Sequence, residues 1–221
     1  RQAVLKLFEM GCQLVILGCN TASAKALRSI QQNDLPKIDP QRRVLGVIRP
    51  TAEIVGKLTQ TKHIGILATP GTTKSNSYNI EINKLWPELN VTGVACPLWV
   101  PIVENNEATG AGADYFVKKR IDHILWLDPD IDTLILGCTH YPLISKNLKR
   151  LYPNIKIFSS SKEVATAVKM ELEAADMLSQ NENAKSIFYA SDLSENFVNM
   201  IERILGRDSD ELNIKFKNLD I

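Results

Sequence analysis

Two cysteines occupy matching positions in this sequence. Cys19 and Cys138 each end the same four-residue run, Ile-Leu-Gly-Cys, which has the pattern of a buried strand followed by a glycine. We expect each glycine to let the chain turn tightly before the cysteine. A helix that begins beside each sulfur would lower the pKa of the thiol and make the thiolate accessible near neutral pH. The repeated run therefore predicts two activated thiols at the carboxyl ends of two strands.

Two such thiols, facing one cleft from opposite sides, suit the inversion of a carbon atom that bears hydrogen. A thiolate removes the proton from one face, the other thiol donates a proton to the opposite face, and the two exchange roles in the reverse reaction. Polar residues follow both sulfurs and would hold the charged groups of the substrate: Asn20 and Thr21 after Cys19, Thr139 and His140 after Cys138. His140 is also close enough to Cys138 to relay its proton.

Three other polar residues are second candidates for this site. Glu104 follows an apolar run, where a carboxylate suggests a polar cleft, although it could also be a solvated residue at a helix start. Thr69 and Thr72 lie in a strand-to-helix turn that is rich in hydroxyls. They could form a cradle for a carboxylate, or serve as ordinary turn and capping residues.

The remaining cysteines and histidines have simpler interpretations. We expect Cys12 and Cys96 to be small buried hydrophobic residues, and His63 and His123 to lie on the surface or on helix faces without a catalytic role. Four widely separated cysteines fit a reducing compartment better than a disulfide framework.

Two other uses of the thiols can be weighed against this interpretation. A dithiol redox protein usually carries a Cys-x-x-Cys pair, which this sequence lacks. A zinc site built from Cys19, Cys138 and His140 would lack an obvious fourth ligand and the usual close ligand pair.

The elements that must position these residues alternate between short apolar runs and longer amphipathic stretches, as in βα units around mostly parallel sheets. The expected strands cover 14–17, 44–48, 64–67, 91–95, 133–136 and 155–158, with weaker candidates at 187–189 and 212–216. The expected helices cover 23–32, 51–61, 74–85, 113–126, 145–151, 163–178 and 193–205, and residues 1–10 also have a helical pattern.

Proline-containing breaks suggest hinges near residues 49 and 158. We therefore predict an α/β fold of two similar domains with mostly parallel sheets and the active site in the cleft between them. Residues 1–49 plus 158–221 would form the first, discontinuous domain, and residues 50–157 the second.

The composition excludes several partner classes. The chain has 221 residues and a net charge of +1, so it lacks the positive field that collects nucleic acid or an anionic membrane. No uncharged apolar stretch approaches the roughly 18 residues that cross a bilayer, and no secretory signal is visible. The sequence predicts a protein that is neither secreted nor bound to membrane or nucleic acid.

With these motifs described, the chain resembles the glutamate racemases. Residues 18–23, Gly-Cys-Asn-Thr-Ala-Ser, are similar to the first cysteine motif of that family. Residues 136–143, Leu-Gly-Cys-Thr-His-Tyr-Pro-Leu, are similar to the second, and their His-Tyr-Pro continuation separates glutamate racemases from the related aspartate racemases. Residues 96–104 resemble a further signature of the family.

The resemblance implies a cofactor-independent isomerase, without pyridoxal phosphate or metal, that acts on glutamate in the bacterial cytoplasm. Its product, D-glutamate, would serve peptidoglycan synthesis, and so cell wall biogenesis and cell shape. The family often forms dimers, so a homodimer is expected. It also implies acid/base catalysis by Cys19 and Cys138, with support from Glu104, and substrate binding by Asn20, Thr21, Thr139 and His140, where His140 also assists Cys138.

The sequence departs from the family in two places. Relatives begin with a strand and an Asp-Ser-Gly turn, then a Pro-Tyr-Gly loop, whereas this chain starts at Arg1 inside a helical pattern, so we expect an N-terminal segment to be missing. Ser159-Ser160 stands where the family often has Asp-Ser before its last large helix. These departures leave two alternatives open: a non-catalytic remnant or amino-acid-binding protein of the same fold, and a racemase that acts on aspartate.

Overall fold

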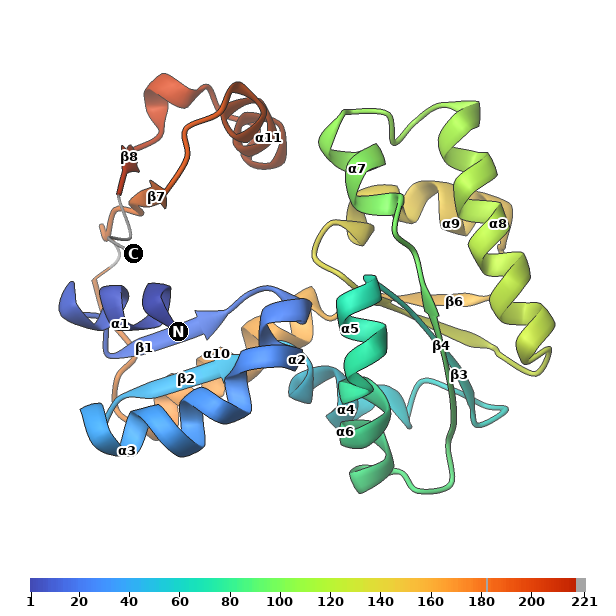
Figure 1. The fold of residues 1–221 in the computed structure, drawn as a ribbon, viewed down its shortest axis with the longest axis horizontal. Helices are drawn as coiled ribbons and strands as arrows, with labels where there is room; N and C mark the ends of the chain where they lie inside the picture. The colour runs from blue at the N-terminus through green and yellow to red at the C-terminus, as the bar shows by residue number, and fades with distance from the viewer. Residues whose placement is uncertain (182, 218–221) are drawn as a thin grey trace. The chain divides into compact units, whose positions relative to one another are not determined.

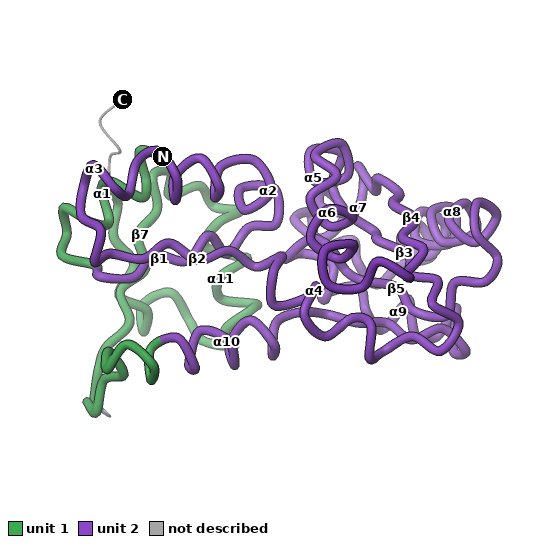
Figure 2. Tube along the Cα trace, turned by 90° about the horizontal axis from the view of Figure 1, so that it is seen from below, with its two compact units in different colours: residues 1–12, 172–221 green, residues 13–171 purple. Residues whose placement is uncertain are grey.

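The computed structural model describes residues 1–181 and 183–217, and it separates the chain into two compact units (Figure 2). Unit 1 consists of residues 1–12 together with the chain from 172 onward, and unit 2 consists of residues 13–171. The domain limits expected from the sequence, 1–49 with 158–221 and 50–157, do not coincide with these units and stay a prediction.

Unit 1 contains two α-helices, a short 3-10 turn and a small parallel sheet among its described residues. The helices are α1 (Gln2–Glu9) and α11 (Glu195–Leu205), the turn is η3 (Ser209–Glu211), and the strands are β7 (Phe188–Ala190) and β8 (Ile214–Phe216). The Ser194 hydroxyl accepts a hydrogen bond from the Phe197 N–H and so caps α11, which ends at Gly206 in the left-handed conformation. Helix α10 (Ser161–Ala174) runs from unit 2 into unit 1.

The larger sheet of unit 2 has four parallel strands in the order β4 (Asn90–Ala95), β3 (His63–Ala68), β5 (Thr133–Gly137) and β6 (Lys156–Phe158). Parallel neighbours need crossover connections, and helices supply them and cover both faces of this sheet (Figure 1). Because both faces are covered, all five residues of β5 are buried. The alternating apolar pattern of a half-exposed strand is absent there for the same reason.

Side-chain alternation along β5 assigns its residues to two separate cores. Leu134, Leu136 and Cys138 pack with buried side chains from helices α7 (Trp99–Glu104), α8 (Ala111–Leu127) and α9 (Ser145–Leu151). Ile135 packs on the other face with α4 (Arg49–Val55) and α6 (Ser77–Leu85). The period of two that defines a strand therefore directs the Cys138 side chain toward the α7 and α8 side.

The smaller sheet of unit 2 pairs β1 (Leu14–Leu17) with β2 (Arg43–Gly46) in parallel, and α2 (Asn20–Ser29) packs against both strands. A Cβ atom at Gly46 would lie 2.6 Å from Cδ2 of Leu27 and 3.0 Å from Oγ of Ser23, so glycine is what allows α2 to approach β2. The Ser23 hydroxyl donates to the Leu17 carbonyl at 2.9 Å and accepts from the Val47 N–H at 3.2 Å. These contacts fix the start of α2 relative to both strands. The chain then continues through a π-helical turn, η1 (Ile30–Asp34), and α3 (Leu35–Ile38).

The structure confirms the α/β class, the parallel sheets and a strand near each expected position. The single helix expected at 74–85 is wrong: Asn76 adopts the left-handed conformation, with φ of 55°, and divides the segment into α5 (Pro70–Ser75) and α6. Helix α7 and the 3-10 turn η2 (Tyr141–Ile144) were not expected, because each is short and contains a proline. Within the described residues, no helix combines the length and the apolar character needed to span a membrane.

Candidate active site

All the residues predicted for the site lie in unit 2, so their geometry can be described together. Cys19 follows β1 and is the N-cap residue of α2, with an extended backbone and an exposed side chain. The structure thus provides the helix start that the sequence predicted beside this sulfur.

Cys138 follows β5 and has a different environment. Its side chain is 7% exposed and belongs to the core that lies under α7 and α8. No α-helix starts beside it; the 3-10 turn η2 follows instead. Burial raises the pKa of the Cys138 thiol, and the charges of Cys19 and Glu104 raise it further, against a smaller opposing effect of hydrogen bonds from the backbone of His140 and Tyr141. The lowered pKa expected for this thiol is therefore wrong, because burial outweighs the local N–H groups.

The glycines before the two cysteines also differ from the expectation. Neither has a positive φ, so the conformational freedom of glycine is not needed at either position, although the Gly18 N–H donates to the Ile16 carbonyl at 3.1 Å and closes a short turn there. A Cβ atom at Gly137 would lie 3.1 Å from the Ala68 Cβ and 3.2 Å from a ring carbon of Tyr78, whereas one at Gly18 would meet nothing within 4 Å. A side chain at Gly137 would therefore press on its neighbours, and one at Gly18 would not.

One cavity of about 200 Å³ brings the two cysteine motifs together. Gly18 and Asn20, the two neighbours of Cys19, line it together with Cys138 and Thr139. Asn20 is buried and Thr139 is exposed. The other lining residues come from β1, β5, the η2 turn, the start of α10 and the segments that follow β2 and β6: Ile16, Val47, Leu136, Pro142, Ser159, Ser160, Ser161 and Val164.

His140 links Cys138 to Glu104. The Cys138 Sγ lies 3.9 Å from Nδ1 of His140, and Nε2 of the same ring lies 3.1 Å from Oε1 of Glu104. Glu104 is the last residue of α7, so the alternative position at a helix start is wrong. Its side chain is 48% exposed and that of His140 is 26% exposed, which makes this a partly solvated pair.

Thr21 joins a cluster of three hydroxyls. Its Oγ1 lies 2.8 Å from that of Thr69 and 3.0 Å from that of Thr72, which are 3.1 Å apart. The Thr69 hydroxyl also accepts from the Thr72 N–H and caps α5. A Cβ at Gly71 would lie 3.0 Å from Cγ2 of Thr21, so a glycine there allows α2 to approach α5. The two threonines that were second candidates in the sequence thus contact a residue predicted to bind substrate.

Tyr78 is a site neighbour that the sequence interpretation missed. It lies on α6, is 2% exposed, and donates a hydrogen bond from its hydroxyl to Oδ1 of Asn20 at 2.6 Å. A single tyrosine on the apolar side of a helix is usually a core residue, and nothing in the spacing of Tyr78 distinguishes it from one.

The residues expected to have no catalytic role show mixed outcomes. Cys96 is buried, as predicted, and burial raises the pKa of its thiol. Cys12 is partly exposed, so its predicted burial is wrong; it lies between α1 and β1, outside both elements. His123 is exposed on α8 and stacks on Trp126.

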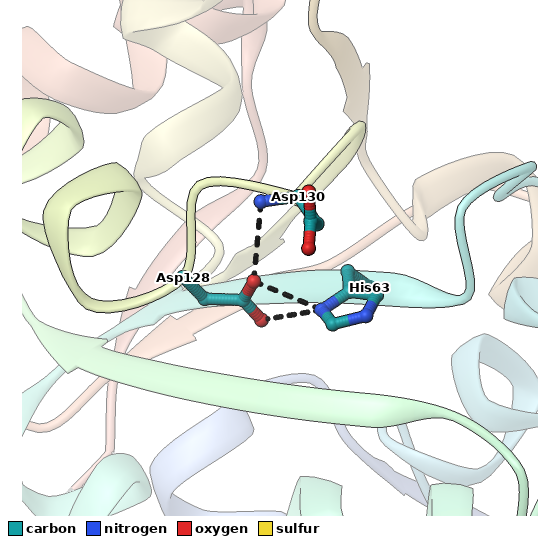
Figure 3. A group of neighbouring side chains, drawn as sticks. All are labelled: His63, Asp128 and Asp130. Carbon is teal, nitrogen blue, oxygen red and sulfur yellow. Dashed lines mark hydrogen bonds and ion pairs between the residues drawn. The ribbon is translucent and has the colours of Figure 1, made fainter.

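His63 is the centre of a separate cluster at the amino end of β3. Its Nδ1 lies 2.9 Å from both carboxylate oxygens of Asp128, and the Asp130 N–H donates to Asp128 Oδ1 (Figure 3). Among the described residues, His63, Asp128 and Asp130 are the one group of His, Cys, Asp or Glu with ligand atoms close enough to share a metal ion. His63 and Asp128 already pair with each other through the ring nitrogen and the carboxylate. The group lies at the opposite end of the strands from the cysteines.

Comparison with known proteins agrees with the geometry, although no family model matches the chain. It is 36% identical to a glutamate racemase of Persephonella marina over 203 residues, which are 91% of this chain and 73% of that protein. The crystal structure of glutamate racemase isoform RacE1 from Bacillus anthracis matches with a TM-score of 0.88 at 32% identity, over 100% of this chain and 79% of that one.

A third match is the crystal structure of glutamate racemase from Francisella tularensis in complex with D-glutamate. It has a TM-score of 0.87 and 27% identity, and it covers 99% of this chain and 78% of the other. The sequence similarity extends over most of both proteins, and it accompanies a shared α/β fold. This chain therefore belongs to the glutamate racemases, a family of amino-acid racemases.

Proposed function

We propose that this protein interconverts L- and D-glutamate with Cys19 and Cys138 as its two acid/base catalysts and without a cofactor or metal. The observation that carries the proposal is the shared cavity, which is lined by Cys138 and by both neighbours of Cys19. Inversion of a carbon by a two-base mechanism needs a base on one face of the reacting atom and an acid on the other, and two thiols from separate strand ends can supply them.

The proton steps balance between the two sulfurs. One thiolate takes the proton from the α-carbon and becomes a thiol, and the electron pair of the broken bond stays on the substrate as a carbanion. The other thiol then donates its proton to the opposite face of that carbon and becomes a thiolate. The enzyme finishes with its proton on the other cysteine, ready for the reverse reaction.

The environments of the two sulfurs favour one resting arrangement. The raised pKa of the buried Cys138 thiol favours the state in which this residue carries the proton. Cys19, by contrast, is exposed and is the N-cap residue of α2. We infer that Cys19 begins as the base and Cys138 as the acid.

The polar residues beside each sulfur would hold the substrate. We assign substrate binding to Asn20, Thr21, Thr139 and His140. Hydroxyl and amide groups can donate hydrogen bonds to carboxylates, and the three-threonine cluster around Thr21 adds two further donors next to α2.

His140 and Glu104 would assist Cys138. The His140 ring lies between the sulfur and the carboxylate, so a proton at Nδ1 can stabilise the Cys138 thiolate while Nε2 donates to Glu104. Because the carboxylate is half-exposed, we assign it a supporting role and leave the proton transfers to the two thiols.

We further propose a cellular role in the bacterial cytoplasm, where D-glutamate would supply peptidoglycan synthesis, and assembly as a homodimer. Membership of the family supports these proposals. Loss of the gene should make growth depend on added D-glutamate, and light scattering of the purified protein should give twice the mass of one chain. Growth without D-glutamate, or the mass of a single chain, would count against the respective proposal.

Deuterium exchange at the α-carbon tests the catalytic assignment. In D2O, a two-base racemase introduces deuterium into the product while substrate recovered early keeps its hydrogen, because each face is served by a different sulfur. Cys19→Ser and Cys138→Ser should each abolish racemisation of both enantiomers, and Cys12→Ser is the control that should retain it. If both cysteine variants racemise glutamate as fast as the unmodified chain, the assignment is wrong.

The same protein samples discriminate the alternatives. A binding protein of this fold would bind glutamate in a calorimeter but leave its optical rotation unchanged. A racemase for aspartate would show the larger kcat/KM with that substrate. We expect turnover, and a preference for glutamate.

A further inference from the structure

Tyr78 contacts both halves of the proposed site without lining its cavity. Its hydroxyl donates to Oδ1 of Asn20, next to Cys19, at 2.6 Å. Its ring lies against Gly137, next to Cys138, so closely that a Cβ atom there would be 3.2 Å from a ring carbon. Both Tyr78 and Asn20 are buried, at 2% and 4% exposure.

The direction of the hydrogen bond determines which end of the Asn20 amide is left free. An asparagine side chain has a carbonyl oxygen that accepts and an NH2 group that donates. Oδ1 is held by Tyr78, and Nδ2 makes no hydrogen bond with any described residue. Since Asn20 lines the cavity with Cys138 and Thr139, Nδ2 is the donor left for a ligand there.

The phenol is suited to act as a permanent donor. Burial raises the pKa of Tyr78 well above its usual range, a hydrogen bond with the Thr51 side chain lowers it by a smaller amount, and the charge of Cys138 raises it slightly. The hydroxyl therefore keeps its proton at neutral pH and remains available as a donor. Because this proton is donated to Oδ1, the NH2 group of Asn20 is the free end of the amide, and an oxygen in its place would repel a carboxylate.

We propose that Tyr78 is a positioning residue that fixes the Asn20 amide with its NH2 group toward a carboxylate of the substrate. The inference rests on the proposed function, in which Asn20 binds glutamate. Tyr78 acts through Asn20 and does not contact the reacting atoms.

The test is Tyr78→Phe, which removes the hydroxyl and keeps the ring beside Gly137. Loss of one neutral hydrogen bond should weaken glutamate binding roughly two- to tenfold, seen as a higher Kd by calorimetry and a higher KM, with kcat within about twofold. Tyr152→Phe is the matched control: its hydroxyl donates to Asp122 on α8, away from the cavity, and its loss should leave the Kd unchanged.

A double-mutant cycle separates positioning from a general structural role. Asn20→Ala should weaken binding by itself, and adding Tyr78→Phe to that variant should change the Kd no further, because the amide through which Tyr78 acts is gone. An unchanged Kd for Tyr78→Phe, or an equal loss with and without Asn20, would overturn the proposal. Circular dichroism melts of each variant should confirm that the fold is retained.

The outcomes also separate this proposal from the proposed function. If glutamate binds but the cysteine variants racemise normally, the catalytic assignment fails while the Kd series still decides the role of Tyr78. If the cysteine variants are inactive and Tyr78→Phe binds normally, only the role of Tyr78 fails. If the unmodified chain binds no glutamate, both fail.

Discussion

Replacing Glu104 with glutamine tests whether this carboxylate transfers protons or only supports His140. Glutamine keeps an oxygen that can accept from His140 Nε2, as Glu104 does at 3.1 Å, but it removes the charge. The Glu104 side chain is 48% exposed, and ion pairs at that level of solvation contribute about 0.2–1 kcal/mol. One kcal/mol corresponds to a factor of about five, so Glu104→Gln should lower kcat/KM by no more than about fivefold.

The assay measures the rate of racemisation of each enantiomer, with circular dichroism as the signal. Glu107→Gln is the control variant. Glu107 is exposed and lies three residues after Glu104, so its replacement should leave kcat/KM unchanged. A positioned acid or base contributes about 10²- to 10⁴-fold. A loss of a hundredfold or more in Glu104→Gln, with the control unaffected, would refute the supporting role and make this carboxylate a participant in proton transfer.

Three further outcomes are expected. Gly137→Ala should lower the free energy of unfolding by about 1–3 kcal/mol, because the new Cβ would lie 3.1–3.2 Å from its neighbours. Gly18→Ala is the comparison variant: its Cβ would meet nothing within 4 Å, so the free energy of unfolding should change by less than about 0.5 kcal/mol. Urea denaturation measures both. Burial raises the pKa of the Cys138 thiol, so the rate at which iodoacetamide labels this residue should still increase with pH where an ordinary thiol is already fully ionised. Peptide mass spectrometry measures this rate. A rate that levels off at the ordinary thiol pKa would contradict the prediction. Ser23→Ala should lower the free energy of unfolding by about 1–3 kcal/mol in the same urea assay, since the buried Val47 N–H loses its acceptor. An unchanged midpoint of unfolding would show that this N–H finds another acceptor.

The sequence was most informative where a pattern depends on local chemistry. The repeated Ile-Leu-Gly-Cys run correctly predicted two strands that end one or two residues before a cysteine, because short buried strands are visible as apolar runs. It also predicted that the polar residues after the sulfurs would gather: Asn20 and Thr139 line the cavity with Cys138, whereas Thr21 and His140 are not among its lining residues. The roles of these residues in catalysis stay predictions.

The errors come from effects that local pattern does not contain. The matching motifs suggested two thiols with the same environment and the same lowered pKa. Cys138 instead lies in the core that α7 and α8 cover, and the residues that bury it are far away in sequence. Helix α7 was missed because Pro101 reads as a helix breaker, although proline is tolerated in the first turn of a helix. Tyr78 was missed because its partner, Asn20, is 58 residues away.

The two cysteines are attached to parts of unit 2 that differ in burial. Cys138 extends β5, whose five residues are all buried between two helical layers and which pairs with strands on both sides. Cys19 extends β1, which pairs only with β2 among the described strands and has one of its four residues buried. Local opening follows such differences, so amide hydrogen exchange should be faster around Cys19 than around Cys138. On warming or in mild denaturant, the Cys19 half of the site should open first, and racemisation should cease while the four-stranded sheet is still folded.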